Sequence, residues 1–139
     1  MTLMRYAAIA AIGLSLAAQT RQTFKARLTP VPADARTRAG LAGTGSVTAT
    51  LDGSKLAING SFDGFVSPAT TAALHNGVAA GVRGALIADL TISKATGGTI
   101  TGSVDLTPPQ VTNLQHGGLY VEIHSEKSPE GVLWGWLLK

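Results

Sequence analysis

The sequence predicts an all-β domain, folded as an antiparallel Greek-key β-sandwich with at most one short helix. Apolar and polar residues alternate at a period of two through most of the chain, which is the pattern of half-buried strands. The 139 residues include 17 glycines, which separate the alternating segments at short intervals. Aromatic residues make up only 5% of the chain, so the core of this single domain must be mainly aliphatic.

Residues 1–19 are predicted to be a secretory signal peptide. Arg5 gives the start of the chain a positive charge, and residues 6–18 form an apolar run that ends in small residues such as Ala17. This run is shorter than the roughly 20 residues that span a bilayer. We therefore expect a periplasmic or secreted protein with no integral membrane segment after cleavage; an uncleaved N-terminal anchor is the alternative. The chain has no cysteine, which excludes disulfides and a lipoprotein anchor.

Residues 20–43 are interpreted as an N-terminal arm that contains the first strand and overlaps the start of the main domain, residues 24–139. Five basic residues gather in this segment, opposed only by Asp34: Arg21, Lys25, Arg27, Arg36 and Arg38. The segment lacks the interleaved aromatic residues of single-strand binders, so a solvated arm is favoured and no nucleic-acid partner is expected.

Two hairpins are predicted in the middle of the chain. The first has strands at 47–51 and 56–62 around the turn Asp52-Gly53-Ser54. The second has strands at 85–93 and 100–106 around the turn at 95–98.

A helix and a third hairpin complete the chain. Thr107 followed by two prolines is typical of a helix cap and first turn, so a short helix is expected through Leu114, ending at Gly117-Gly118. Leu119, Val121 and Ile123 then face one side of a strand, while Tyr120, Glu122 and His124 face the other. After a loop at 125–131, a last strand at 132–138 brings the total to about seven strands.

The C-terminal segment resembles the closing motif of the CHRD domain, the module repeated in chordin and found alone in many bacterial exported proteins. It reads GGLYVEIHSEKSPEG at 117–131 and WGWL at 134–137, against an approximate family pattern of G-G-x-Y-V-N-V-H-T and then P-x-G-E-I-R-G. Further similarity covers FKARL at 24–28, the hairpin at 45–62 and TAALHNG at 71–77, where the family has A-H-I-H-G. The resemblance implies an antiparallel sandwich similar to the copper-zinc superoxide dismutase architecture, and protein binding only by analogy with chordin.

The chain departs from the family pattern at three polar positions. Ala73 replaces the first histidine of the H-I-H pair, Glu122 replaces the strand asparagine, and Trp134 stands in place of the arginine. These departures weaken the transfer of any polar site from the family.

A copper or zinc site is the alternative function. His75, His124 and Glu122 are its candidate ligands, with His116 and Asp63 as further donors, because imidazole and carboxylate suit these metals. Three histidines are few for such a centre, so no cofactor is expected. Glu122 and His124 could equally form an ion pair along one strand face.

A hydrolase would have to use His124 beside Ser125, with Glu122 or Glu126 as the orienting carboxylate. Adjacent side chains on a strand point to opposite faces, so they cannot easily share a proton. We therefore expect that the protein is not an enzyme.

Tyr120, Trp134 and Trp136 are the candidate partner-binding residues. Trp134 and Trp136 share one face of the last strand, while Leu133 and Leu137 fill the opposite face. The aromatic rings could pack in the core or could anchor a partner. The resulting hypothesis is an exported, non-enzymatic binding or accessory module that engages a protein partner; a small subunit of an exported oxidoreductase assembly is the weaker alternative.

Overall fold

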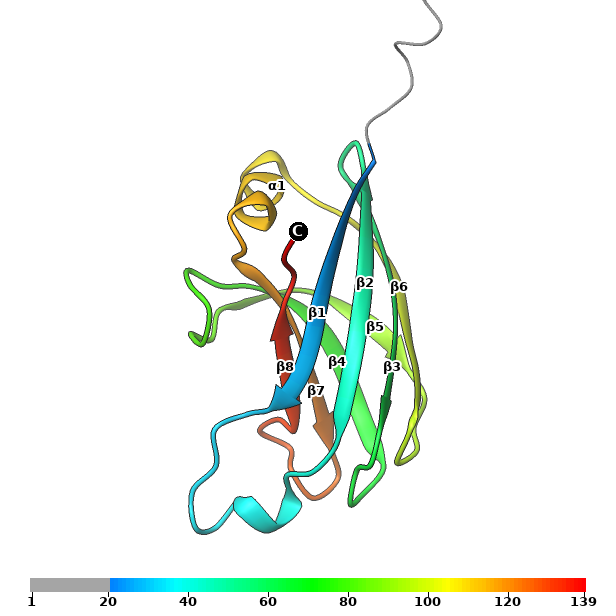
Figure 1. Cartoon of the computed structure of the whole chain (residues 1–139), viewed down its shortest axis with the longest axis vertical. Helices are drawn as coiled ribbons and strands as arrows, with labels where there is room; N and C mark the ends of the chain where they lie inside the picture. Colours follow the sequence, from blue (N-terminus) through cyan, green and yellow to red (C-terminus); the bar gives the residue numbers. More distant parts are fainter. Residues whose placement is uncertain (1–20) are drawn as a thin grey trace, which may run out of the picture.

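The computed structural model describes residues 21–139, which form eight strands and one α-helix (Figure 1). The strands follow the period-two alternation of apolar and polar residues. The strands are β1 (Gln22–Pro30), β2 (Thr44–Asp52), β3 (Lys55–Asp63), β4 (Ala69–Asn76), β5 (Ala85–Ile92), β6 (Gly98–Asp105), β7 (Leu119–Ser125) and β8 (Leu133–Trp136). The helix is α1 (Pro108–Gln115), and a single 3₁₀ turn, η2 (Arg38–Gly40), lies between β1 and β2. The signal peptide predicted for residues 1–19 lies outside the described residues.

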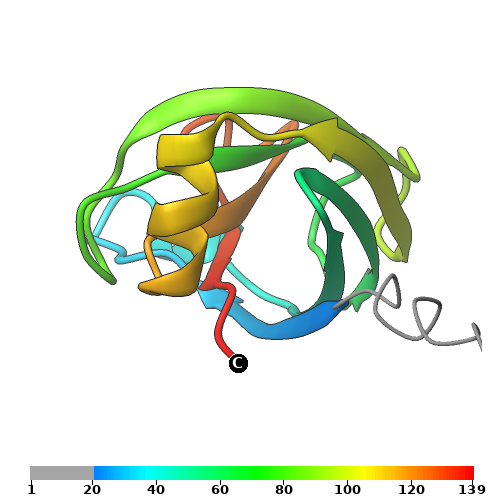
Figure 2. The same ribbon diagram turned by 90° about the horizontal axis from the view of Figure 1, so that it is seen from above.

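The strands close into a barrel in the order β1-β2-β3-β6-β5-β4-β7-β8, with every pair antiparallel (Figure 2). The predicted class, antiparallel all-β with one short helix, is confirmed, but the predicted sandwich is wrong. Two short seams join what would otherwise be two sheets: β5 meets β6 at two residue pairs, and β1 meets β8 at two. Alternation of apolar and polar residues is the same in a sandwich and in a barrel, so it could not reveal these seams.

The first predicted hairpin is confirmed. β2 and β3 pair continuously from Thr44 opposite Asp63 to Asp52 opposite Lys55. Gly53 occupies the turn with a φ of 67°, a conformation that favours glycine. The second hairpin is correct only near its turn, because β5 then diverges to pair with β4, and β6 to pair with β3. This divergence makes the Greek-key crossover.

The predicted helix is confirmed, both in its position and in its N-terminal cap at Thr107. The Thr107 hydroxyl accepts a hydrogen bond from the Gln110 backbone N–H at 3.3 Å, and the Gln110 side chain accepts one from the Thr107 N–H at 2.9 Å. This reciprocal arrangement is a capping box. α1 lies at one end of the barrel and buries Leu114 (Figures 1 and 2).

The barrel interior is filled by the inward residues of all eight strands, such as Phe24, Ile58 and Leu74. Strands β7 and β8 differ from most of the others because their outer faces are largely buried too. The segments at 31–43 and 77–84 contribute to this cover, since Val31 and Leu41 pack on Tyr120 and Trp134 of the outer face, and Arg83 contacts Glu122. No helix within residues 21–139 is long and apolar enough to cross a membrane.

Candidate functional site

The three departures from the expected family pattern lie side by side on the outer face of the barrel. Strand pairing sets Ala73 of β4 opposite Glu122 of β7, and Glu122 opposite Trp134 of β8. They form one cross-strand row, so the three substitutions act on a single local environment. We call the outer face of β4, β7 and β8, with the loop at 77–84, the Glu122 face.

Arg83 from the loop at 77–84 supplies the positive charge of this face. Its Nη1 donates a hydrogen bond to Oε2 of Glu122, and its guanidinium carbon lies 5.2 Å from the centroid of the Trp134 ring. Both contacts are favourable, an ion pair on one side and a cation–π contact on the other. The Glu122 side chain is only 3% exposed, whereas that of Arg83 is 48% exposed. The carboxylate is therefore buried beneath a cation that reaches solvent.

His124 holds the other oxygen of the same carboxylate. Its Nε2 lies 3.4 Å from Oε1 of Glu122, and its Nδ1 lies 2.6 Å from the carbonyl oxygen of Pro129. A carbonyl only accepts, so Nδ1 carries a proton. The hydrogen bond with Glu122 raises the pKa of His124, against the effect of burial, and the Pro129 carbonyl adds to the rise. The ion pair considered from strand spacing is thus present.

The environment of Glu122 favours its charged form. Burial alone would raise the pKa of this carboxyl, but the hydrogen bond from His124 and the charge of Arg83 outweigh burial and hold the pKa below its ordinary value. Gly131 makes room for the carboxylate, because a Cβ at that position would lie 2.8 Å from Oε2 of Glu122. Gly131 also has a φ of 127°, which other residues rarely adopt.

The predicted aromatic residues form one cluster beside Glu122. The ring centroids of Tyr120 and Trp136 are 4.7 Å apart, and those of Trp134 and Trp136 are 4.8 Å apart. Trp134 and Trp136 share a face opposite Leu133 and Leu137, as predicted. Tyr120 is fully buried and Trp134 is 9% exposed, while Trp136 is half-buried. In the isolated chain only Trp136 offers a substantial part of its ring to a partner.

Two hydrogen bonds fasten the loop at 77–84 to the barrel through Gly84. Its N–H donates to the Tyr120 hydroxyl at 2.7 Å, and its carbonyl accepts from Nδ1 of His75 at 3.1 Å. The His75 ring stacks on Tyr120 with centroids 5.0 Å apart and an interplanar angle of 10°. His75, Tyr120 and Arg83 therefore anchor this loop together.

The proposed metal ligands His75, Glu122 and His124 do not converge, so this alternative is not supported. His75 lies opposite Tyr120, which is four residues from His124 along β7, or about 13 Å. His116 is exposed at the end of α1, and Asp63 ends β3 on the opposite sheet. Within residues 21–139, no three histidine or carboxylate side chains are placed to share a metal ion.

The residues that a hydrolase would use are likewise not brought together. Ser125 is 2% exposed, and its hydroxyl oxygen accepts hydrogen bonds from the Ser67 hydroxyl at 3.1 Å and from the Ser128 N–H at 3.2 Å. Glu122 is occupied by Arg83 and His124, as described above. Ser125 and His124 are adjacent residues of β7, and adjacent side chains on a strand point to opposite faces.

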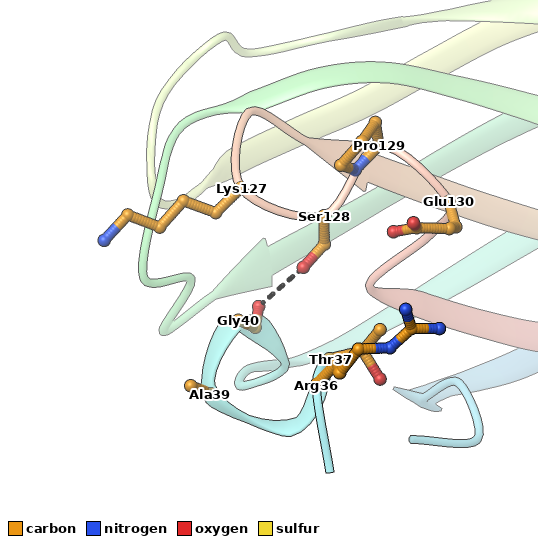
Figure 3. Close-up of a pocket in the computed structure, with 8 residues that line it drawn as sticks. All are labelled: Arg36, Thr37, Ala39, Gly40, Lys127, Ser128, Pro129 and Glu130. Atoms are coloured by element: carbon orange, nitrogen blue, oxygen red, sulfur yellow. Dashed lines mark hydrogen bonds between the residues drawn. The ribbon is translucent and has the colours of Figure 1, made fainter. Parts of the chain in front are cut away.

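Two open depressions border the Glu122 face where the segment at 31–43 meets the loop at 126–131. One, of about 600 Å³, is lined by Val31, Leu41, Arg83 and Gly131 among others. The second, of about 520 Å³, lies between Arg36 and Lys127, and its wall is tied by a 3.1 Å hydrogen bond from the Ser128 hydroxyl to the Gly40 carbonyl (Figure 3). Arg83 thus links the buried carboxylate to a solvent-accessible hollow.

Sequence reasoning found Tyr120, Glu122, His124, Trp134 and Trp136 but missed Arg83. The available signal was a single cation within an otherwise uncharged stretch, residues 77–84. Within that stretch, Gly81-Val-Arg-Gly84 has the pattern of a turn, and nothing in its spacing indicates which carboxylate Arg83 reaches.

Comparison with known proteins identifies the family. No curated protein and no solved structure gave a match. The model of the CHRD domain matches residues 24–137, which is nearly the whole chain and includes every residue of the Glu122 face described above. The chain belongs to the CHRD domain family.

Proposed function

We propose that this chain is an exported, non-enzymatic CHRD module that binds a protein partner through the loop at 77–84 and the adjoining edge of β5. The predicted signal peptide and the extracellular character of the family support export. The observation that carries the binding proposal is the concentration of exposed apolar side chains in this one segment.

Three of the five large apolar side chains that residues 21–139 expose fall between positions 78 and 86. Val78 is 85% exposed, Leu86 57% and Val82 45%. The loop projects from the side of the barrel (Figure 1). Exposed apolar residues that gather on one feature are typical of interaction sites, whereas single ones are ordinary.

The anchoring of the loop favours binding because it limits the entropy lost on association. Arg83 is paired with Glu122, and Gly84 is hydrogen-bonded to both Tyr120 and His75. A loop that is already held in place needs less ordering when it docks. The buried aromatic residues therefore act as the support of the binding loop, and Trp136 lies at the margin of the surface.

Several features support a non-enzymatic role. Both oxygens of Glu122 are engaged by Arg83 and His124, so the carboxylate is not available as a general base. The Ser125 hydroxyl is buried and directed away from His124. The cluster of Glu122, Arg83 and His124 thus has a structural role.

Site-specific photocrosslinking tests the binding proposal. A photoreactive amino acid at position 82 is expected to give a discrete adduct in the native envelope. The matched control is position 66, because Val66 is also a valine with 45% exposure but lies in the loop between β3 and β4. Val78→Asp should abolish the adduct from position 82 and leave the melting temperature unchanged, since Val78 is almost fully exposed. Equal adducts from positions 82 and 66 would contradict the proposal.

Export is tested separately by N-terminal sequencing of the protein from the native host. Cleavage between about residues 17 and 20 is expected from the apolar run and the small residues at its end. An intact Met1, or a wholly cytoplasmic pool, would contradict this part of the proposal.

A further inference from the structure

The opposite side of the barrel, the outer face of β1, β2, β3 and β6, carries short hydroxyl and amide side chains in register. Strand pairing sets them in two adjacent cross-strand rows over β2, β3 and β6. They are Ser46, Thr48, Asn59, Ser61, Thr99 and Thr101, and all six are exposed. Of the five large exposed apolar side chains of the described residues, Leu138 borders this face, because it pairs with Lys25, and the other four lie elsewhere.

Each of the two rows ends in a cation on β1. Lys25 is paired with Thr48, and Arg27 with Ser46, and both cations are exposed. Neither has a carboxylate within ion-pairing distance among residues 21–139. In contrast, Arg21 and Lys55 at the far end of this face are paired with aspartates, at 3.5 and 3.6 Å. Lys25 and Arg27 are thus two unpaired cations on a hydroxyl-rich surface, against one unpaired carboxylate among the described residues of this face, that of Asp63 at the end of β3.

The surface is hollowed at these cations. An open depression of about 520 Å³ lies between Lys25 and Arg27 on β1 and Ser46 and Thr48 on β2. A second depression, of about 280 Å³, continues from Ser46 to Ser61 on β3 and ends at Asp63, the one charged residue of its lining. The two share Ser46 and its neighbour Gly45, so they form one path across the strands.

We propose that this face binds an acidic polysaccharide, with Lys25 and Arg27 pairing with its carboxylates and the serine, threonine and asparagine rows pairing with its hydroxyls. Hydroxyl side chains both donate and accept, which matches a polyhydroxylated ligand. Arg27 can hold a carboxylate with two parallel hydrogen bonds, and Lys25 adds a point charge about 7 Å along the strand. The ligand is therefore a polymer that presents repeated carboxylates among hydroxyl groups.

The chemistry of the face disfavours other classes of partner. A protein interface needs apolar or aromatic residues at its centre, and the face offers short polar ones. Single-stranded nucleic acid is bound largely by stacking on aromatic rings. The hydroxyl rows and the two cations fit a carboxylated glycan better than either.

Affinity electrophoresis of the purified protein through gels that contain alginate, a polyuronate, tests the inference. The wild-type protein should be retarded by alginate and not by neutral dextran. The double variant Lys25→Gln with Arg27→Gln should lose about tenfold or more in affinity, because two charge-assisted contacts are removed. Its control is Arg36→Gln with Lys127→Gln, which removes the same charge from a different depression, the one beside the η2 turn (Figure 3). Thr48→Val keeps the side-chain shape and should weaken retardation by a few fold.

Three results would overturn the inference: no retardation by alginate at low salt, equal losses in the two double variants, or stronger binding to single-stranded DNA than to alginate. Near-ultraviolet circular dichroism should be unchanged in all variants, since each altered side chain is exposed. The protein partner proposed above contacts a different face, so failure of either proposal leaves the other unaffected.

Discussion

At the residue scale, the buried carboxylate of Glu122 is stabilised by the residues that surround it. Burying a carboxylate costs free energy unless its oxygens are paired. Here Arg83 pairs with Oε2 and His124 with Oε1, and Gly131 leaves the space that the carboxylate occupies. The arrangement is strongly interdependent, because the loss of either partner leaves a buried charge with an unpaired oxygen.

The pair of Glu122 and His124 predicts a specific dependence of stability on pH. The pKa of Glu122 is lowered in the folded state, so its stabilisation is present above the ordinary value of 4.5 and is lost as the pH falls through the folded value. The pKa of His124 is raised, so its stabilisation is complete below the ordinary value of 6.5 and is lost as the pH rises through the folded value. The pair should therefore contribute most between these two ordinary values.

Melting temperatures of the wild type and of His124→Gln, measured from about pH 4 to 9, test this expectation. The difference between the two proteins should be largest near pH 6 and should shrink towards pH 9, when the wild-type imidazole is neutral. His116→Gln is the control, because His116 is exposed at the end of α1. A difference that stays constant across the range would show that His124 stabilises by packing and not by charge.

The two tryptophans of β8 should behave differently when truncated. Trp134 is 9% exposed and lies between Arg83 and the Tyr120 cluster, so Trp134→Ala should cost about 3 to 5 kcal/mol of unfolding free energy. Trp136 is half-buried, and Trp136→Ala should cost clearly less. Urea unfolding of both variants measures the two costs.

Trp136→Phe provides the matched control. Among the described residues the indole Nε1 of Trp136 is buried without a hydrogen-bond partner, which is unfavourable. Phenylalanine keeps the aromatic contact and removes the unpaired donor, so this variant should be about as stable as the wild type. If Trp136→Ala proves as costly as Trp134→Ala, both rings are core residues and Trp136 is not available to a partner.

At the residue level the sequence predicted which side chains share a face but not what they contact. Alternation along β7 correctly places Tyr120, Glu122 and His124 together, because side-chain direction in a strand follows from position alone. Arg83 could not be assigned, since its partner lies 39 residues away and is reached through a loop. Local pattern determines faces, whereas long-range pairing depends on the tertiary fold.

At the level of elements, the loop at 77–84 has a sequence typical of flexible loops, but contacts with residues outside it hold it in place. It is rich in glycine and alanine, and most of its residues are exposed. Its anchors are the Arg83–Glu122 ion pair, the hydrogen bonds of Gly84 with Tyr120 and His75, and those of Gly77 with the Gly118 carbonyl and the Asn113 side chain. The rigidity of the loop therefore depends mainly on its contacts with the barrel and not on its own sequence.

Removal of an anchor should loosen the loop before it unfolds the barrel. Arg83→Ala is expected to speed amide hydrogen exchange across residues 77–84 and to lower the unfolding free energy by about 1 to 3 kcal/mol, because Oε2 of Glu122 loses its partner. Hydrogen exchange followed by mass spectrometry measures the first effect. Val82→Ala is the control within the same loop, since Val82 is exposed and anchors nothing. Unchanged exchange in Arg83→Ala would show that the hydrogen bonds of Gly84 and Gly77 hold the loop without the ion pair.

Elements with a strong local signal were predicted well. The cap and first turn of α1 follow from Thr107 and the two prolines after it, and the β2–β3 turn follows from Gly53. The hairpin between β5 and β6 was predicted only in part. β5 and β6 pair at only two positions, because most of β5 pairs with β4 and most of β6 pairs with β3.

For the whole molecule, closure of the barrel depends on the two short seams. A sandwich would leave the edges of β1, β5, β6 and β8 unpaired, and unpaired edges invite association with other strands. Closure removes these edges with two residue pairs at each seam and with a further bridge between Lys25 of β1 and Leu138 after β8. The residues of the seams carry no feature that distinguishes them from other strand ends, so the sequence could indicate an all-β fold but not its closure.

An engineered disulfide across the β5–β6 seam can test closure directly, because the natural chain has no cysteine. Thr91 and Thr101 lie directly opposite each other and are exposed. Opposite residues of antiparallel strands have Cα atoms about 4.5 to 5.5 Å apart, within the range that a disulfide requires. The variant Thr91→Cys with Thr101→Cys should therefore oxidise readily to an intramolecular disulfide without loss of the near-ultraviolet circular dichroism spectrum.

The matched control is Thr91→Cys with Ser103→Cys, which shifts one cysteine by two positions on the same strand face. Its Cβ atoms should lie about 7 to 8 Å apart, too far for a disulfide without movement of the backbone. Free-thiol titration after mild oxidation should thus find no thiols in the first variant and both in the control. In an open sandwich the facing sheets are about 10 Å apart, so neither variant would close and both would retain their thiols. Oxidation of the first variant alone would locate the seam at Thr91 and Thr101 in solution.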